Sequence, residues 1–223
     1  SVKRIENNTF NECTSLTEIK IPSSVDYIGD NAFNLCSSLT QIILPSSLKE
    51  IGNSAFQGCL LITEIEIPST VTKIGSHAFQ KCKKLTQIKL PPSLICICEY
   101  SFDECSSLEQ ITIPSSVTKI ERYAFAGCSS LTQLEIPSSV TVIGMHAFSR
   151  CSMITEVKIP SSLQVIESRT FYSCSNLCKI SIPPSVAKIE KEAFRDCSSL
   201  TCVSIPSSVT EIESCAFKGC SSL

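Results

Sequence analysis

Cysteine is the residue type in this sequence that could take part in the most kinds of chemistry. The chain contains 15 cysteines among 223 residues. Cysteine thiols can form disulfides, bind zinc or act as nucleophiles. Ten of them each follow a phenylalanine by three residues and recur with a strict period of 23, from Cys13 to Cys220. A regular ladder of this kind is typical of small buried apolar side chains, which is a common role of free cysteine. We therefore expect these ten thiols to be structural.

The other five cysteines are Cys96, Cys98, Cys178, Cys202 and Cys215. The sequence contains no Cys-x-x-Cys pair and no histidine close enough to suggest a zinc knuckle, so we expect no metal site and no cofactor. The separation of Cys178 and Cys202 exceeds the period by one, which places them on adjacent strands of the repeat but offset by one position. A disulfide between these two residues is an open alternative.

The two histidines, His77 and His146, occupy the same position of the repeat, three repeats apart. They are too far apart to share a metal ion or a proton, so we expect both to be surface residues. The serines gather in Pro-Ser-Ser and Cys-Ser-Ser, where capping and turn formation explain them. None has a histidine and an acid placed to activate it, and the glycines occur singly rather than in a phosphate-binding loop. The sequence predicts no catalytic residue and a protein that is not an enzyme.

Composition narrows the remaining classes of function. Hydrophobic residues make up 43% of the chain and charged residues 18%, which predicts a folded core. Nineteen basic and 21 acidic residues leave a net charge of −2, so the sequence lacks the basic footprint of a nucleic-acid-binding protein. No stretch approaches the roughly 18 apolar residues of a membrane span. We expect no nucleic-acid partner and no membrane insertion by this segment.

The period of the cysteine ladder extends to other residue types. All ten phenylalanines, from Phe10 to Phe217, keep this spacing, and so do nine of the 11 prolines, from Pro22 to Pro206. An isoleucine precedes each phenylalanine by five residues, from Ile5 to Ile212. Several residue types fixed to one period indicate a tandem repeat whose units stack into a solenoid.

One unit, residues 68–90, shows the local structure that the pattern predicts. Ile88 and Leu90, which follow Leu85, are apolar residues two positions apart. This alternation indicates a short strand, which ends at Pro91. Residues 76–82 carry apolar side chains at helical spacing, which predicts one helical or 3₁₀ turn. A single coil cannot offset the backbone entropy of about 1–2 kcal/mol per ordered residue, so neighbouring coils must share their apolar faces.

The full repeat, Ile-Pro-Ser-Ser-Val-x-x-Ile-x-x-x-Ala-Phe-x-x-Cys-x-x-Leu, resembles the BspA-like (treponemal-type) leucine-rich repeat family along the whole chain. The resemblance implies an α/β solenoid of 23-residue coils, with a concave parallel β-sheet and short strands and helical or 3₁₀ turns on the convex side. We expect one domain over residues 1–223 with nine to ten coils. The asparagine ladder of other leucine-rich repeats is mostly replaced here by Pro-Ser-Ser, so proline geometry and serine hydroxyls would satisfy the turn backbone.

Neither end of the sequence carries a polar capping unit, which solenoids need to cover their terminal apolar faces. The sequence therefore predicts a fragment of a longer array that lacks both caps. End-to-end self-association through the open coils is the alternative.

The predicted concave face is the candidate binding surface. Its outward residues flank the inner isoleucine of each strand and comprise Glu18, Lys20, Gln41, Ile43, Glu64, Glu66, Gln87, Lys89, Gln110, Thr112, Gln133, Glu135, Glu156, Lys158, Lys179 and Ser181, with Cys202 and Ser204 continuing the series. This set has mixed charge and no aromatic residue, whereas binding hot spots favour Tyr, Trp and Arg. A broad protein-binding face and a merely solvated polar sheet are both compatible with it.

Two local departures interrupt the pattern. Ile95, Cys96 and Cys98 stand where other units carry polar residues or glycine, and Leu60 and Leu61 replace the usual Ser-Ser after Cys59. These residues could mark an exposed apolar contact. Drift in a redundant repeat is the alternative.

The resemblance implies a non-enzymatic protein–protein interaction module, acting as an adhesin or binding host or partner proteins. A structural spacer or assembly component of a larger complex is the alternative function. The family implies a cell-surface or secreted location, whereas many unpaired cysteines favour the reducing cytoplasm, so the compartment stays open. The identity of the protein partner does not follow from the sequence.

Overall fold

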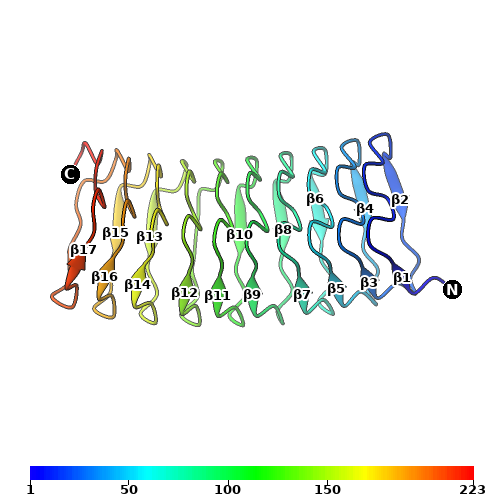
Figure 1. Cartoon of the computed structure of the whole chain (residues 1–223), viewed down its shortest axis with the longest axis horizontal. Coiled ribbons are helices and arrows are strands. Elements are labelled where there is room, and N and C mark those ends of the chain that lie inside the picture. Colours follow the sequence, from blue (N-terminus) through cyan, green and yellow to red (C-terminus); the bar gives the residue numbers. More distant parts are fainter.

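The computed structural model describes all residues 1–223 as a rod of stacked coils, with the two termini at opposite ends (Figure 1). Most coils contribute strands to two sides of the rod. The strands of three residues are β2 (Glu18–Lys20), β4 (Gln41–Ile43), β6 (Glu64–Glu66), β8 (Gln87–Lys89), β10 (Gln110–Thr112), β13 (Glu156–Lys158) and β15 (Lys179–Ser181). The strands of two residues are β1 (Arg4–Ile5), β3 (Tyr27–Ile28), β5 (Glu50–Ile51), β7 (Lys73–Ile74), β9 (Cys96–Ile97), β11 (Lys119–Ile120), β12 (Val142–Ile143), β14 (Val165–Ile166), β16 (Lys188–Ile189) and β17 (Glu211–Ile212).

The three-residue strands pair in parallel with a register of one repeat. Gln87 pairs with Glu64 of the preceding coil on one side and with Gln110 of the next coil on the other. Their hydrogen-bonded groups are β2–β4, β6–β8–β10 and β13–β15. Alternation buries the central residue of most of these strands and exposes both neighbours, as expected for a sheet that covers a core on one face. The predicted parallel sheet is confirmed.

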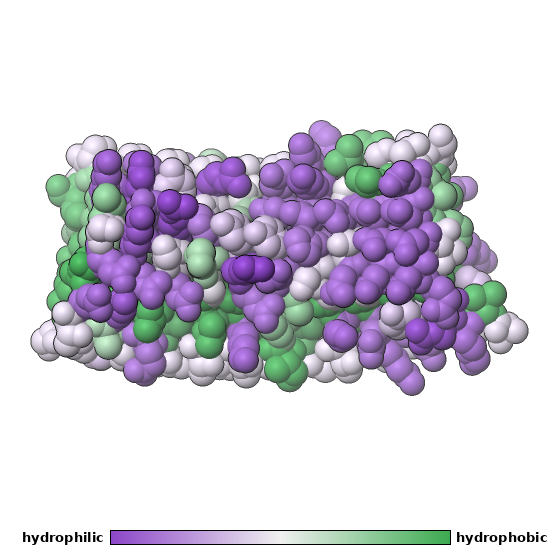
Figure 2. All heavy atoms as spheres, in the orientation of Figure 1, coloured by the Kyte–Doolittle hydropathy of each residue, from purple (hydrophilic) through white to green (hydrophobic).

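A continuous seam of apolar side chains fills the rod. A single cluster of 63 buried residues runs from Ile5 to Cys220. The phenylalanine rings stack along the axis from Phe10 to Phe217, with centroids 5.1–5.7 Å apart and nearly parallel planes. Ring stacking of this kind adds to the free energy gained by burial. Figure 2 shows that hydrophilic side chains cover most of the visible outer surface, with hydrophobic ones scattered among them.

The prediction of a helical or 3₁₀ turn is wrong, and with it the α component of the predicted fold class. Residues 76–82 form turns, and no helix occurs anywhere in the chain. His77 and Lys81 adopt left-handed φ values of 59° and 61°, which a right-handed helix does not allow. The N–H groups of His77, Phe79 and Lys81 donate to carbonyls of the next coil rather than within their own. Bonding between coils therefore replaces the hydrogen bonds that a helix would make.

The cysteine ladder is buried as predicted from Cys36 onward, while Cys13 of the first coil is exposed. The ladder also has a hydrogen-bonding role. Each thiol from Cys36 to Cys220 in the ladder donates to the carbonyl oxygen of the phenylalanine 26 residues earlier, at 3.1–3.2 Å. The same oxygen also accepts a backbone N–H from its own coil, as Phe56 O does from Cys59. Cysteine thus fills a small apolar space and supplies a weak donor to a buried carbonyl.

Glycine sets how closely the first coils approach on the short-strand side. The N–H of Asn53 donates to Asp30 Oδ1 of the preceding coil at 2.7 Å. In the same way, Asp30 N–H donates to Asn7 Oδ1, and Ser76 N–H donates to Asn53 Oδ1. A Cβ on Gly52 would lie 2.6 Å from the Asp30 nitrogen, from Asp30 Oδ1 and from the Gly29 carbonyl carbon. The close approach therefore requires glycine.

The ladder of two-residue strands is interrupted twice. Its hydrogen-bonded groups are β1–β3–β5–β7, β9–β11–β12 and β14–β16–β17. The interruptions fall where glycine is followed one repeat later by a residue with a side chain, from Gly75 to Cys98 and from Gly144 to Glu167. The loss of hydrogen bonds between neighbouring short strands thus coincides with the replacement of glycine.

Ten phenylalanines in register agree with the predicted nine to ten coils. That the chain is a fragment without caps stays a prediction. The structure contains no helix that is long and apolar enough to cross a membrane.

Candidate functional site

The sheet face comprises the outward residues of the three-residue strands together with Gln133 and Glu135. Every residue predicted for the concave face, from Glu18 to Ser181, is exposed. Gln133 and Glu135 lie outside a strand, although Gln133 still forms a parallel bridge with Gln110. The alternation of the strands positions these side chains, because the inward-facing apolar residue between each pair fixes the direction of both neighbours. That this surface binds a ligand remains a prediction.

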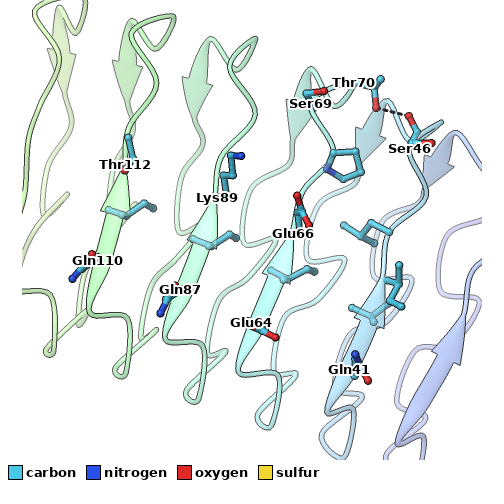
Figure 3. Close-up of a pocket in the computed structure, with 17 residues that line it drawn as sticks. Gln41, Ser46, Glu64, Glu66, Ser69, Thr70, Gln87, Lys89, Gln110 and Thr112 are labelled. Atoms are coloured by element: carbon cyan, nitrogen blue, oxygen red, sulfur yellow. Dashed lines mark hydrogen bonds between the residues drawn. The ribbon is translucent and has the colours of Figure 1, made fainter.

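A hollow with a volume of about 900 Å³ lies on the sheet face. It extends across β4, β6, β8 and β10 and reaches the Pro-Ser-Ser turns beside them. Figure 3 shows Gln41, Glu64, Gln87 and Gln110 in one row across the strands. Glu66, Lys89 and Thr112 form a second row at the other end of these strands (Figure 3). The hollow therefore presents two parallel rows of hydrogen-bonding groups.

The sheet face carries charges of both signs. Glu66 and Lys89 stand directly opposite each other on β6 and β8. Farther along, Lys179 Nζ lies 3.1 Å from Glu156 Oε1, and both side chains are mostly exposed. Exposed pairs of this kind contribute little free energy, so these side chains can exchange their partners for those of a ligand. Ile43 is 71% exposed at the edge of the hollow and adds an apolar contact to the polar rows.

A second candidate surface was missed by the sequence analysis. His77, Tyr100, Tyr123 and His146 stack face to face with centroids 4.4–4.6 Å apart. The two histidines are half-buried ends of one stack, rather than isolated exposed residues. The period could have revealed this arrangement, because the two tyrosines occupy the histidine position of the intervening coils. We call these four residues and the adjoining Arg150, Arg169, Tyr172 and Arg195 the turn strip.

The turn strip contains a small basic hollow of about 260 Å³ at its end beside His146. Arg169 Nε lies 2.6 Å from Glu192 Oε2, and Arg195 Nη1 lies 3.3 Å from Glu192 Oε1. The hydrogen bond from Arg169 lowers the pKa of Glu192. Burial, together with the charges of Arg169 and Arg150, lowers the pKa of His146. Three arginines around one acid leave this hollow with excess positive charge.

The cysteines outside the ladder occupy three different surroundings. Cys178 and Cys202 are exposed and free, and Cys178 Sγ donates to Thr155 O at 3.2 Å, so the alternative of a disulfide between them is not realised. Cys215 is exposed as well. Cys96 and Cys98 are half-buried beside Glu121, and these three residues could offer ligands to a metal ion.

Of the residues that depart from the repeat pattern, only some are exposed. Leu60, Leu61 and Ile95 are exposed, which agrees with the expected apolar contact points. The neighbouring Cys96 and Cys98 are not.

Comparison with known proteins bears on the function of these surfaces. The chain matches the family described as "BspA type Leucine rich repeat region", in six copies, over residues 3–107 and 95–223. No curated protein matches the chain.

Solved structures from bacteria are similar to it. The Treponema pallidum leucine-rich repeat protein is 31% identical, with a TM-score of 0.68, over 82% of this chain and 78% of that one. A leucine-rich cell surface protein from Faecalibacterium prausnitzii is 29% identical, with a TM-score of 0.68, over 100% of this chain and 76% of that one. A leucine-rich repeat protein from Bacteroides ovatus is 28% identical, with a TM-score of 0.60, over 100% of this chain and 81% of that one.

Proposed function

Because this chain belongs to the BspA-type leucine-rich repeat family, we propose that it is a non-enzymatic protein-interaction module whose sheet face binds a protein partner. The observation that carries the proposal is the hollow across β4, β6, β8 and β10. The hollow has two rows of polar groups, mostly amides, carboxylates and an ammonium. Within each row, neighbouring groups stand on adjacent strands, which are about 4.8 Å apart. Such rows suit the polar groups of an extended protein segment or loop lying across the strands.

The mixed charge of the sheet face supports a partner that is itself of mixed charge. A surface without one dominant sign does not concentrate a strongly charged ligand, so recognition would depend on hydrogen bonds and shape. Ile43, at the edge of the hollow, supplies an exposed apolar contact beside the polar rows. A role at the cell surface, such as adhesion, is supported by the similarity to the F. prausnitzii cell surface protein.

The test compares binding by three forms of the whole chain. Wild type, a sheet-face variant (Glu64→Arg with Gln87→Arg) and a control variant (Lys83→Glu with Lys84→Glu) are immobilised and exposed to a panel of extracellular proteins. All four positions are exposed, so folding should be retained, which circular dichroism checks. We expect a partner that binds wild type and the control at least tenfold more tightly than the sheet-face variant. Equal binding by all three forms, or no binding across the panel, would contradict the proposal.

The turn strip is a second candidate surface because it holds the tyrosines and arginines that the sheet face lacks. These residue types dominate the binding energy of many interfaces. The exposed Arg150 allows a clean comparison, because Arg150→Glu leaves the ring stack and the Arg169–Glu192 pair in place. Loss of binding in this variant alone would assign the partner to the turn strip.

The alternative role as a spacer or assembly component is tested separately by sedimentation. Concentration-dependent growth of the sedimenting species, with no partner bound by any form, would favour assembly. A monomer at all concentrations would favour the interaction module.

A further inference from the structure

Three potential metal ligands meet on the short-strand side of the rod, at the junction of two coils. Cys96 lies on β9, Cys98 follows that strand directly, and Glu121 follows β11 of the next coil. Their two sulfur atoms and one carboxylate oxygen all lie within 4.8 Å of one another. All three residues are half-buried. No other group in the chain brings three such ligand atoms together.

The repeat itself explains this meeting. Residues i and i+2 of an extended segment point to the same side, so Cys96 and Cys98 project together. Glu121 occupies the position of Cys98 in the next coil, and β9 and β11 pair in parallel beside it. The third ligand comes from the neighbouring coil, so the spacing of residues within one unit gives no sign of it.

The carboxylate of Glu121 is already held in place. Its Oε2 accepts a hydrogen bond from the Glu99 N–H at 3.0 Å. Outer hydrogen bonds of this kind orient the ligands of metal sites. The same hydrogen bond recurs from Ser168 N–H to Glu190 and from Lys191 N–H to Glu213. No pair of cysteines accompanies the glutamate at either place. The pair of thiols is what distinguishes the junction at Glu121.

The backbone also separates at this junction. β7 and β9 are the first neighbouring short strands without hydrogen bonds between them, because Cys98 replaces the glycine of the preceding coils. The side chains of Cys96 and Cys98 therefore lie beside an opening in the ladder rather than in a closely packed contact. Small shifts of these side chains are compatible with the remaining hydrogen bonds to β11.

The ligand types select the metal. Two thiols with one carboxylate favour zinc and similar thiophilic divalent ions over calcium or magnesium, which require oxygen ligands. Tetrahedral zinc has Zn–S distances of about 2.3 Å and Zn–O distances of about 2.0–2.2 Å, which puts neighbouring ligand atoms about 3.5–3.8 Å apart. Ligand atoms 4.8 Å apart therefore need to approach by about 1.0–1.3 Å, a distance that side-chain rotation supplies.

We propose that Cys96, Cys98 and Glu121 form a binding site for a thiophilic divalent cation of the zinc class, with the fourth coordination position open to water or to a group from a partner. Binding deprotonates both thiols, so up to two protons pass to solvent for each cation bound. Two thiolates and a carboxylate leave net negative charge on the complex. Lys73 of the preceding coil lies close enough to act electrostatically on Cys98 and offsets part of that charge.

This proposal is independent of the sheet face, which lies on a different side of the coil.

The test uses the whole chain, reduced and freed of metal by a chelator. Cobalt(II) or cadmium(II) is added, and thiolate-to-metal charge-transfer absorption reports sulfur ligation. Zinc is then used to displace the probe. We expect one ion per chain, displacement by zinc, and a rise in the melting temperature at saturating zinc. The variants are Cys96→Ser, Cys98→Ser and Glu121→Gln, and the matched control is Cys178→Ser with Cys215→Ser, which removes two exposed thiols.

The control should bind as wild type does. Each cysteine variant should lose the absorption band or bind at least 100-fold more weakly, and Glu121→Gln should weaken binding about tenfold, since metal-site substitutions typically cost 10–100-fold. Circular dichroism of the metal-free variants shows whether they fold, and Glu121→Gln retains the carbonyl that Glu99 N–H needs. The proposal is overturned when wild type gives no charge-transfer band, when the band follows the control cysteines, or when the pair merely oxidises to a disulfide without binding metal.

Discussion

Gly52→Ala provides the most direct test of how closely the coils approach on the short-strand side. The added Cβ would lie 2.6 Å from the backbone nitrogen of Asp30, from Asp30 Oδ1 and from the carbonyl carbon of Gly29. Two of these three atoms belong to the backbone and cannot rotate away. The coils must therefore separate locally, which weakens the hydrogen bonds from Gly52 N–H to Ile28 O at 2.8 Å and from Asn53 N–H to Asp30 Oδ1 at 2.7 Å.

The expected cost follows from three contributions. Overpacking typically costs about 1–3 kcal/mol, and the two hydrogen bonds, weakened but not lost, together cost about 1 kcal/mol. The lower entropy of the unfolded alanine chain returns about 0.4–1 kcal/mol. The free energy of unfolding should therefore fall by about 1–4 kcal/mol, which lowers the melting temperature by roughly 2–4 °C per kcal/mol in a chain of this size.

Thermal and urea unfolding followed by circular dichroism measure this loss. Thr72→Ala is the matched control, because Thr72 is exposed on the same side of the next coil and should change stability by less than about 0.5 kcal/mol. In an Asp30→Ala background the Gly52→Ala cost should shrink but not vanish, because the backbone contacts remain. A Gly52→Ala protein as stable as wild type would refute the claim that glycine is needed for space.

Three further predictions concern the core and its buried polar groups. Phe102→Ala should destabilise the fold by about 3–5 kcal/mol in urea denaturation, because its buried ring stacks on two neighbours; a loss below about 1 kcal/mol would contradict continuous stacking. In native protein at neutral pH, a thiol reagent should modify the four exposed cysteines quickly and the nine buried ones only after unfolding. Burial hinders access and raises the pKa of Cys36 to about 11 and of Cys151 to about 12. Rapid modification of all 15 would contradict the burial of the cysteine ladder. Burial raises the pKa of Asp103 above its ordinary 3.8, so its ionised form destabilises the fold at neutral pH and this cost disappears as the pH falls. Asp103→Asn, which can still accept the hydrogen bond from Gln80, should therefore raise the urea midpoint at neutral pH and lose that advantage near pH 4; equal midpoints at both pH values would contradict this assignment.

Much of the fold follows from the period alone. The spacing of phenylalanine, cysteine and isoleucine predicts which side chains share the core, and the alternation around Ile88 predicts which residues lie on the sheet face. The helical turn was wrong because burial of Ala78, Phe79 and Cys82 does not distinguish a helix from a turn. The deciding residues are His77 and Lys81, whose left-handed conformation is stabilised by bonds to the next coil. Neither residue is a glycine, so this unit alone gives no signal. Asn31 and Gly58 hold the corresponding positions of earlier coils with φ values of 53° and 71°, so a comparison between units would have indicated the left-handed turns.

The candidate sites divide in the same way. The sheet face was predictable because each of its residues is identified by its own position in the unit. The turn strip and the group of Cys96, Cys98 and Glu121 depend on comparing one position across successive units. A column of residues read once per repeat would have placed Tyr100 beside His77 and Glu121 beside Cys98. The identity of a partner depends on details of shape that no column contains.

The two interruptions in the short-strand ladder have a mechanical consequence. They divide the short-strand ladder into three blocks. Across each interruption the coils stay joined by the apolar seam and by backbone bonds of the turns, such as His77 N–H to Glu99 O and His146 N–H to Ser168 O, but they lack the bonds between short strands. Apolar packing tolerates sliding and bending better than a hydrogen-bonded ladder, whose bonds are directional. Under tension along its axis, the rod should yield first between β7 and β9 and between β12 and β14, so that it behaves as three stiff segments with two compliant joints.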